Sequence, residues 1–169
     1  DAMTCAQEMV SRLEKGDYAG ASKKMYGRPA LGAAPDSANV AVELLWTEFL
    51  GSMDFAISDK CYVTDTGVAV DATVQMLDVP AVISSMENYA RELLGRRVAA
   101  AKDMSEIYDS DNNFRQDIMD KVLRDATMQA LSENTLVCQE NITLNLIYEK
   151  SQWWVVPDAQ LQSILSAGF

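Results

Sequence analysis

The sequence predicts an α+β fold in which helices pack on one face of a curved antiparallel sheet. Apolar and polar residues alternate along Val68–Met76 and Thr135–Tyr148 with the period of two that is typical of strands with one buried face. Each stretch is joined to another apolar stretch by a short polar turn, which predicts two hairpins. Helical periodicity fills the chain before, between and after the hairpins, and this order favours α+β over alternating α/β units.

Helices are expected before the first hairpin. Apolar residues recur at helical spacing over the first 25 residues, Gly16 interrupts them, and Asp17 can cap a second, short helix. A stretch rich in glycine and proline then predicts a loop. Beyond this loop, Asp36 or Ser37 is expected to cap a third helix that ends at Ser52.

The first hairpin is expected from Phe55 to Met76. Its first strand covers Phe55–Asp65, and its second strand begins at Val68. The turn between them, Thr64–Gly67, has glycine at its last position, where turns favour it. In the second strand, Asp71, Thr73 and Gln75 mark the face that contacts water.

Two helices are expected between the hairpins. Asp78 followed by Pro80 is a helix start signal, because an N-cap residue precedes a proline in the first turn. The helical pattern that follows continues to a polar break at Asp109–Asn113, with a bend at Gly95 as an alternative to a straight helix. A second helix is expected over Phe114–Leu131, so that the two helices form an insert between the hairpins.

The second hairpin contains the longest predicted strand. Thr135–Tyr148 is followed by a polar turn, Glu149–Gln152, and by a returning strand, Trp153–Val156. Adjacent residues of a strand face opposite sides, so only one of the two neighbouring tryptophans can belong to the core. Asp158 after a proline then predicts a short C-terminal helix.

The length, charge and amino-acid composition of the chain exclude several classes of protein. The chain has 169 residues, 49% apolar and 23% charged, which suits one globular domain over residues 1–169. The formal net charge is −11 and at most two basic residues are adjacent, so nucleic acid and anionic membrane surfaces are not expected as partners. No apolar run reaches the roughly 18 residues of a membrane span.

The sequence contains no histidine. This removes the most common general base, the most common zinc ligand and every Ser-His or Cys-His pair, whereas carboxylates, tyrosine and lysine remain available for acid–base chemistry. One polar segment partly follows a calcium loop, but Phe114 stands where that loop requires glycine, which favours a capped helix–helix turn. We expect neither a metal nor a cofactor. The polar residues of that segment are Asp109, Asp111, Asn113, Asp117 and Asp120.

Four segments together resemble a known family. They are LEKGDYAGA at Leu13–Ala21, VAVDATV at Val68–Val74 after a D-T-G turn, DVPAVISSM at Asp78–Met86, and WWVVPD at Trp153–Asp158. With these segments the chain resembles, over nearly its whole length, secreted lipoproteins of Gram-positive bacteria whose exposed domain is similar to the nuclear transport factor 2-like, or cystatin-like, superfamily.

The resemblance implies a cone-like domain in which helices wrap a strongly bent antiparallel sheet. It also implies a signal peptide and a lipid-modified cysteine upstream of Asp1, so that the domain would be extracellular and attached to the membrane only through an anchor outside this chain. Enzymes of the superfamily use His/Asp or Tyr/Asp groups at the mouth of the cone, and the absence of histidine excludes the first pair. The insert from Pro80 to Leu131 departs from a minimal cone, in which more strands are expected.

Glu140 is the main candidate for a functional carboxylate. It interrupts the apolar face of the long strand, where an unpaired carboxylate would be costly to bury and would have a raised pKa. A group of this kind is a candidate for ligand contact or acid–base chemistry. The alternative is a bulge or strand end that turns Glu140 towards solvent.

Five aromatic residues are candidates for the lining of a pocket between helix and sheet: Trp46, Tyr62, Tyr148, Trp153 and Trp154. The alternative for most of these rings is ordinary core packing. The tryptophan that the strand turns away from the core is either covered by a helix or available for an interaction, because an exposed indole often marks a contact surface.

The three cysteines are far apart in the sequence and do not follow a metal-binding spacing. Cys61 and Cys138 are both expected on inward strand faces, where they would form a disulfide if their strands were neighbours and the compartment oxidising. Cys5 lies on an apolar helix face and is a competing partner. The odd count favours buried thiols.

These observations leave three functional hypotheses. The first is a non-enzymatic binding or interaction domain at a bacterial cell surface, with an unidentified small molecule or protein as its partner. The second is a small enzyme in which Glu140 acts with Tyr62 or Tyr148. The third is a structural homodimer joined through the open face of the sheet or through the helical insert.

Overall fold

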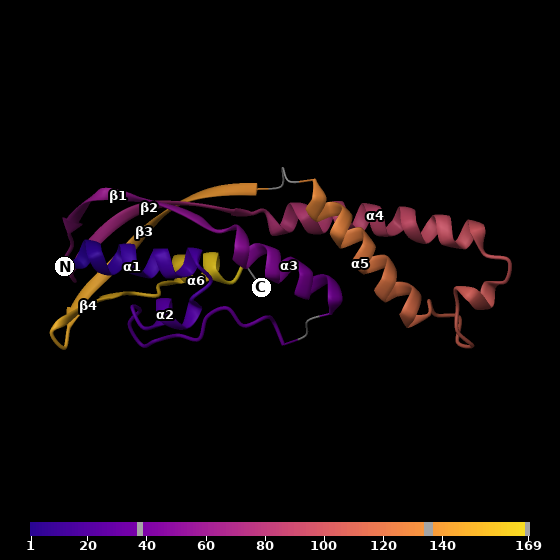
Figure 1. Cartoon of the computed structure of the whole chain (residues 1–169), viewed down its shortest axis with the longest axis horizontal. Helices are drawn as coiled ribbons and strands as arrows, with labels where there is room; N and C mark the ends of the chain where they lie inside the picture. The colour runs from indigo at the N-terminus through magenta and orange to yellow at the C-terminus, as the bar shows by residue number, and fades with distance from the viewer. Residues whose placement is uncertain (37–38, 134–136, 168–169) are drawn as a thin grey trace. The chain divides into compact units, whose positions relative to one another are not determined.

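The computed structural model describes residues 1–36, 39–133 and 137–167, and confirms the predicted α+β class with a two-helix insert between two hairpins (Figure 1). The described residues form six α-helices, one short 3₁₀ helix and an open, four-stranded antiparallel sheet. In chain order these elements are α1 (Ala2–Glu14), α2 (Tyr18–Ser22), α3 (Val40–Ser52), β1 (Asp54–Val63), β2 (Val68–Leu77), α4 (Val79–Ala100), the 3₁₀ helix (Met104–Glu106), α5 (Gln116–Ser132), β3 (Val137–Glu149), β4 (Gln152–Val155) and α6 (Ala159–Leu165).

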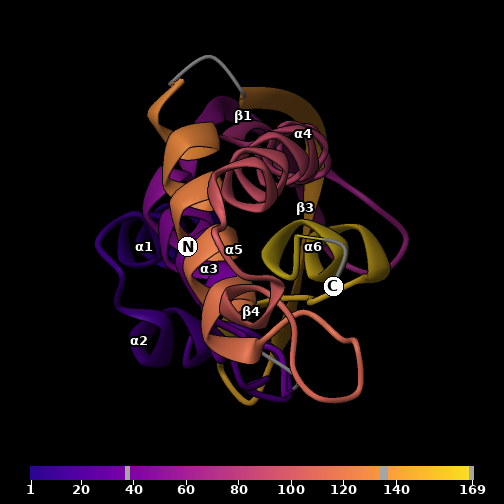
Figure 2. The same cartoon turned by 90° about the vertical axis from the view of Figure 1, so that its right-hand side faces the viewer.

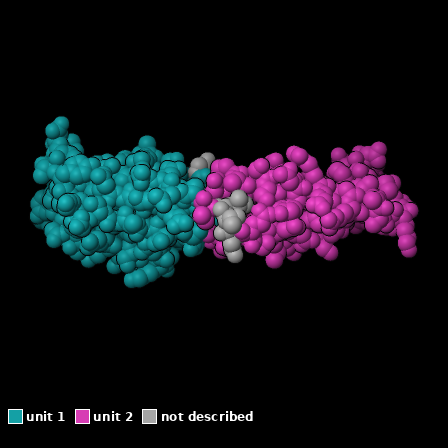
Figure 3. All heavy atoms as spheres, turned by 90° about the horizontal axis from the view of Figure 1, so that it is seen from above, with its two compact units in different colours: residues 1–33, 49–77, 138–169 teal, residues 34–48, 78–137 magenta. Residues whose placement is uncertain are grey.

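The chain divides into two compact units (Figure 3). The first comprises residues 1–33, 49–77 and 138–169, and contains the sheet together with α1, α2 and α6. The second comprises residues 34–48 and 78–137, and contains α4 and α5. The boundary falls within α3. The single domain expected over residues 1–169 stays a prediction.

The sheet of the first unit has the strand order β1-β2-β3-β4. The turn predicted between β1 and β2 is confirmed, because the Thr64 amide donates to the Gly67 carbonyl at 3.0 Å and the Gly67 amide donates to the Thr64 hydroxyl at 3.1 Å. The register of β1 against β2 shifts between Ile57 and Cys61. Beyond this irregularity Cys61 is exposed, so the prediction that it faces inward is wrong.

Helices cover one face of the sheet (Figures 1 and 2). The alternation predicted for β3 is confirmed at its centre, where Ile142, Leu144 and Leu146 are buried. The apolar stripe predicted for α1 is also buried, and α1 packs against β1, β2 and β4. α1 and α6 lie on the same side of the sheet. The opposite face carries polar residues such as Asp71 and Gln75, which are exposed between the buried residues of β2.

The outer edge of β4, and the part of β3 that lies beyond its pairing with β4, are covered by other segments of the first unit. The backbone amide of Tyr26 donates to the Val155 carbonyl at 2.8 Å, so the segment after α2 runs parallel to β4. On β3, the side chain of Gln160 donates to the Asn141 carbonyl at 3.2 Å and accepts from the Thr143 amide at 3.4 Å. A single amide side chain therefore takes the place of a partner strand, which protects the edge from further pairing.

Five of the described α-helices begin at a capping side chain, the first of them α1, where Asp1 accepts from the Thr4 amide at 2.8 Å. Asp17, Asp78 and Asp158 each accept a hydrogen bond from a backbone amide of the first turn of their helix, as predicted. For α3 the cap is Asn39, whose side-chain oxygen accepts from two backbone amides at 3.0 Å. The expected cap at Asp36 is therefore wrong, because the helix begins at Val40, and Ser37 lies outside the described residues.

The second unit contains the insert. α4 passes through Gly95 without a break and ends at Ala100, and its predicted continuation is replaced by an irregular segment that contains the 3₁₀ helix. Within that segment the Asp109 carboxylate accepts hydrogen bonds from two backbone amides, so it caps the turn before α5. Tyr89 of α4 donates a hydrogen bond to Glu133, the C-cap of α5, and thereby joins the two helices.

Candidate functional site

The predicted site residues do not gather at one place. Glu140 is exposed on β3, and within the described residues it makes no hydrogen bond to either Tyr62 or Tyr148. Tyr62 is 48% exposed on β1, where its hydroxyl donates to Asp71. Trp46 is buried in the second unit. The structure therefore agrees with the alternative in which the Glu140 carboxylate faces solvent.

The remaining three predicted residues lie on the β3–β4 hairpin. Tyr148 and Trp153 are paired across the hairpin, and their ring centroids are 5.3 Å apart. Trp154 faces the other side and is 8% exposed, whereas Trp153 is half-buried. The prediction that only one of the two tryptophans joins the core is confirmed, because successive side chains of a strand point to opposite faces.

The turn of this hairpin contains two residues in the left-handed backbone region. Lys150 has φ 53° and Ser151 has φ 65°, and the flanking residues Glu149 and Gln152 are paired. Two central residues with positive φ characterise the type I′ turn, which usually contains Asn-Gly. Here the turn places a lysine at the tip of the hairpin, beside the buried indole of Trp154.

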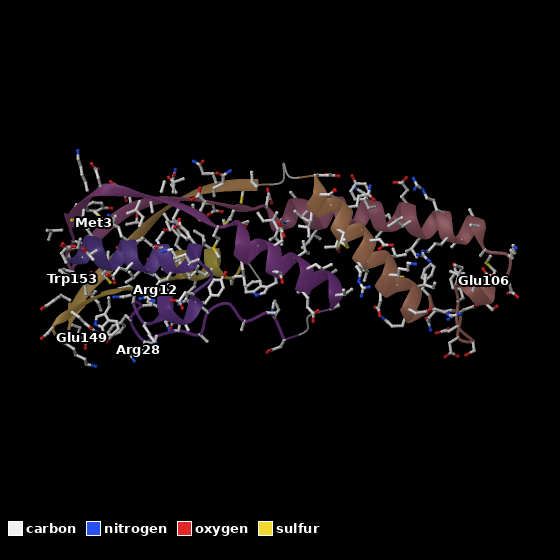
Figure 4. All side chains as sticks on the ribbon, viewed as in Figure 1. Met3, Arg12, Arg28, Glu106, Glu149 and Trp153 are labelled. Atoms are coloured by element: carbon white, nitrogen blue, oxygen red, sulfur yellow. The ribbon has the colours of Figure 1, made fainter. Side chains whose placement is uncertain are left out.

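A hollow of about 470 Å³ lies on the Trp154 side of the hairpin, and we call it the hairpin hollow. The guanidinium carbon of Arg28 lies 5.7 Å from the centre of the Trp154 ring, within the range of a cation–π interaction. The indole N–H of Trp154 donates to the backbone carbonyl of Glu149 at 3.0 Å, which fixes the ring. Figure 4 labels Arg28 and Glu149 beside this hairpin. The hollow is lined by Tyr26, Gly27, Arg28, Glu149, Lys150, Gln152 and Trp154.

Of the charged residues around the hairpin hollow, the acidic one has a hydrogen-bond partner and the two basic ones have no ion-pair partner in the described part of the chain. Glu149 accepts a hydrogen bond from the Tyr26 hydroxyl, and this interaction raises the pKa of Tyr26 above its ordinary value. Among the described residues, neither Arg28 nor Lys150 forms an ion pair. Two unpaired cations therefore border a hollow floored by an aromatic ring, in a chain whose net charge is −11.

The sequence interpretation missed Tyr26 and Arg28. Both lie in the loop after α2, and they reach the hairpin because the chain beside Met25 pairs with Val155, far along the sequence. The only local signal was the glycine before Arg28. Gly27 has φ 75° and Arg28 has φ 49°, so two successive left-handed residues turn the arginine towards the hairpin.

The opposite side of the hairpin has a second hollow, of about 540 Å³, which the pair Tyr148 and Trp153 helps to line. Its charges are better neutralised, because Lys24 forms an ion pair with Glu8. The thiol of Cys5 is directed at the Trp153 carbonyl, with a sulfur–oxygen distance of 3.3 Å, and burial raises its pKa. Lys23 also lines this hollow and forms no ion pair among the described residues, but burial leaves little reactive thiolate on this side.

The described part of the chain has neither a candidate metal site nor a helix that could span a membrane. No three Cys, Asp or Glu residues there come together in a way that could hold a metal ion. None of the helices described is both long and apolar enough to cross a bilayer. Comparisons with protein-family models, curated proteins and solved structures gave no significant match to this chain.

Proposed function

We propose that this chain is a non-enzymatic binding domain that holds a small ligand with an acidic group and an apolar body in the hairpin hollow. The observation that carries the proposal is the stacking of the unpaired Arg28 on Trp154 beside the unpaired Lys150. A guanidinium offers planar, bidentate hydrogen bonding to a carboxylate, and the lysine adds a second positive charge. The indole offers the apolar surface for the rest of the ligand.

The arrangement of Tyr26 and Glu149 favours binding over catalysis. A carboxylate that already accepts a hydrogen bond from a phenol is held in one position, and the raised pKa of Tyr26 makes this phenol a poor acid–base group near neutrality. These two residues instead fix one wall of the hollow. The volume of about 470 Å³ lies within the roughly 300–1,000 Å³ that small-molecule sites span.

We also propose that this domain lies outside the cell. Its support is the resemblance of the chain to secreted lipoproteins, which implies a lipid anchor outside this chain. A binding domain held at the cell surface would capture its ligand before uptake or signalling. The upstream gene sequence tests this part directly, since a signal peptide that ends in a lipid-modifiable cysteine is expected there.

Titration of the isotope-labelled chain with benzoate tests the binding site. Benzoate has a carboxylate on an apolar ring, and benzyl alcohol is a neutral control of similar shape. We expect benzoate, but not benzyl alcohol, to shift the indole N–H resonance of Trp154 in nuclear magnetic resonance spectra. Arg28→Gln should weaken the benzoate effect by about tenfold or more, since a charged hydrogen bond contributes roughly 1.5–3 kcal/mol.

Lys60→Gln is the matched control, because Lys60 is an exposed cation on β1 that does not line the hollow. The benzoate titration of this variant should resemble that of the unaltered chain. Equal shifts of the Trp154 resonance with benzoate and benzyl alcohol, or a benzoate response that survives Arg28→Gln, would show that the hairpin hollow is not an anion-binding site.

A further inference from the structure

The sheet face of the first unit that the helices leave uncovered has a third hollow, with different chemistry. This hollow has a volume of about 520 Å³, and we call it the sheet-face hollow. It lies over three adjacent strands, β1, β2 and β3. Its lining residues are Ala56, Ile57, Ser58, Asp71, Ala72, Thr73, Asn141, Ile142 and Thr143.

Hydrogen bonds between neighbouring strands fix the polar side chains of this face. The Thr73 hydroxyl donates to the side-chain oxygen of Asn141 at 3.0 Å, and the Thr143 hydroxyl donates to Oδ1 of Asp71 at 3.1 Å. The same oxygen of Asp71 accepts from the Tyr62 hydroxyl at 3.1 Å. Side chains held in this way lose little further conformational entropy when a ligand binds.

Part of the hydrogen-bonding capacity of these groups is unused. A carboxylate has two acceptor oxygens, and the described residues occupy only Oδ1 of Asp71. In Asn141 the side-chain oxygen is engaged, so its amide N–H groups can donate outwards. The face therefore presents donors and acceptors side by side, in fixed positions.

Tyr62 does not itself line the hollow, but its hydroxyl is bound to Asp71, which does, so its exposed ring lies beside this polar surface. In the register of the sheet Tyr62 is opposite Ala69, yet its hydroxyl reaches Asp71, two residues further along β2. The ring must therefore extend along the strand rather than stand upright on it. Ala69 is 1% exposed while Tyr62 is 48% exposed, as expected for a ring that leans on the sheet and leaves one surface to solvent.

This combination restricts the chemistry of a ligand. Asp71 is the only charged residue in the lining, all of which is described, so the hollow has no cation to recognise phosphate, sulfate or nucleic acid. Protein contact surfaces have apolar centres depleted of charge, whereas five of the nine residues in this lining have a hydroxyl, amide or carboxylate group. Such groups match neutral hydroxyl groups, which both donate and accept, and an aromatic surface matches the C–H face of a sugar ring.

We propose that the sheet-face hollow binds a neutral polysaccharide, with Tyr62 stacked on a pyranose ring and with Asp71 and Asn141 bound to its hydroxyl groups. The hollow is shallow and open, and it crosses three strands, which suits a stretch of a chain rather than an enclosed monosaccharide. This proposal is independent of the hairpin hollow, because none of the lining residues is shared between the two.

Titration with defined oligosaccharides tests this proposal. The labelled chain would be titrated with hexasaccharides of β-1,4-linked glucose, α-1,4-linked glucose and β-1,4-linked N-acetylglucosamine, up to millimolar concentrations. We expect at least one of them to shift the amide resonances of Thr73 and Asn141. Tyr62→Ala should weaken that binding by about tenfold or more, whereas Tyr62→Phe, which keeps the ring, should retain most of it.

Tyr148→Ala is the matched control, since Tyr148 is a 60% exposed tyrosine on the hairpin outside the sheet-face hollow. It should leave oligosaccharide binding unchanged. Circular dichroism of each variant confirms that the fold is retained, and Asp71→Asn provides a second alteration if Tyr62→Ala does not fold. The proposal is overturned if no hexasaccharide shifts Thr73 or Asn141, or if binding withstands both Tyr62→Ala and Asp71→Asn.

Discussion

The backbone carbonyl of Leu146 in β3 occupies the space that a side chain at position 67 would need. A Cβ atom built on Gly67 would lie 2.0 Å from the Leu146 oxygen, far closer than any van der Waals contact. Gly67 ends the turn between β1 and β2, so this contact determines how closely the first hairpin approaches the central strand. Glycine is required here by a close approach of two backbones rather than by a left-handed conformation.

Gly67→Ala is expected to destabilise the chain by roughly 2–4 kcal/mol, because a methyl group in this position must displace backbone atoms of β3. Urea unfolding followed by circular dichroism measures this change. Gly51→Ala is the control, since a Cβ there meets nothing within 4 Å and Gly51 lies within α3. Its free energy of unfolding should be unchanged or slightly raised, and a similar loss in both variants would refute the steric explanation.

Acid should selectively weaken the start of α2. The Gly20 amide and the Arg12 guanidinium, which pairs with Asp17 at 2.7 Å, both lower the pKa of the Asp17 carboxyl. A lowered folded-state pKa contributes stability above the unfolded-state value of about 3.9, and this contribution is lost as pH falls through the folded-state pKa. Asp17→Asn should therefore destabilise the chain at neutral pH but have progressively less effect below about pH 4.

Unfolding curves of the unaltered chain and the variant at several pH values measure this difference. Asparagine keeps an acceptor for the Gly20 amide, so the comparison mainly isolates the charge. Arg12→Gln supplies the double-mutant cycle, whose coupling energy with Asp17→Asn should disappear in acid. A coupling energy that does not depend on pH would show that Asp17 contributes without its charge.

Features that depend only on residues close together in the sequence could be predicted from it. The opposite orientations of Trp153 and Trp154 follow from strand geometry alone. The caps at Asp17 and Asp78 follow from the hydrogen bonds that a short polar side chain can make to the first turn of a helix. The cap of α3 was misplaced because several suitable residues precede that helix and only the backbone path selects Asn39.

The candidate sites depend on contacts that the sequence does not encode locally. Arg28 reaches Trp154 only because the chain after α2 pairs with β4. Cys61 faces solvent because β1 changes register before it, and a bulge of this kind has no distinct sequence signal. Glu140 continues the inward alternation of β3, yet it is exposed because that part of the strand lies beyond the buried centre of the sheet.

The two thiols Cys5 and Cys61 should react at very different rates. Cys61 is exposed on β1, whereas Cys5 is buried and burial raises its pKa, so that less of the reactive thiolate is present. With a chromogenic disulfide reagent, Cys61→Ser should abolish the fastest phase in the native protein. Cys5→Ala should leave that phase unchanged, and Cys5 itself should react fully only in denaturant. A fast phase that survives Cys61→Ser would place the exposed thiol elsewhere.

The hydrogen bond between Tyr26 and Glu149 should be visible in the titration of the phenol. The carboxylate stabilises the protonated phenol, and ionisation would place two negative charges side by side, so the pKa of Tyr26 is raised. Glu149→Gln removes the negative charge but keeps an acceptor. The pKa of Tyr26 should therefore fall towards its ordinary value of about 10, as followed by the ring carbon resonances of labelled tyrosine.

The sign of the linked stability effect follows from the raised pKa. The interaction between Tyr26 and Glu149 stabilises the folded chain below the ordinary tyrosine pKa of about 10, and this contribution is lost as pH rises through the folded-state value. Glu140→Gln is the matched control, because this exposed carboxylate does not line the hairpin hollow. A Tyr26 titration that is the same in both variants would mean that Glu149 does not hold the phenol at the wall of the hollow.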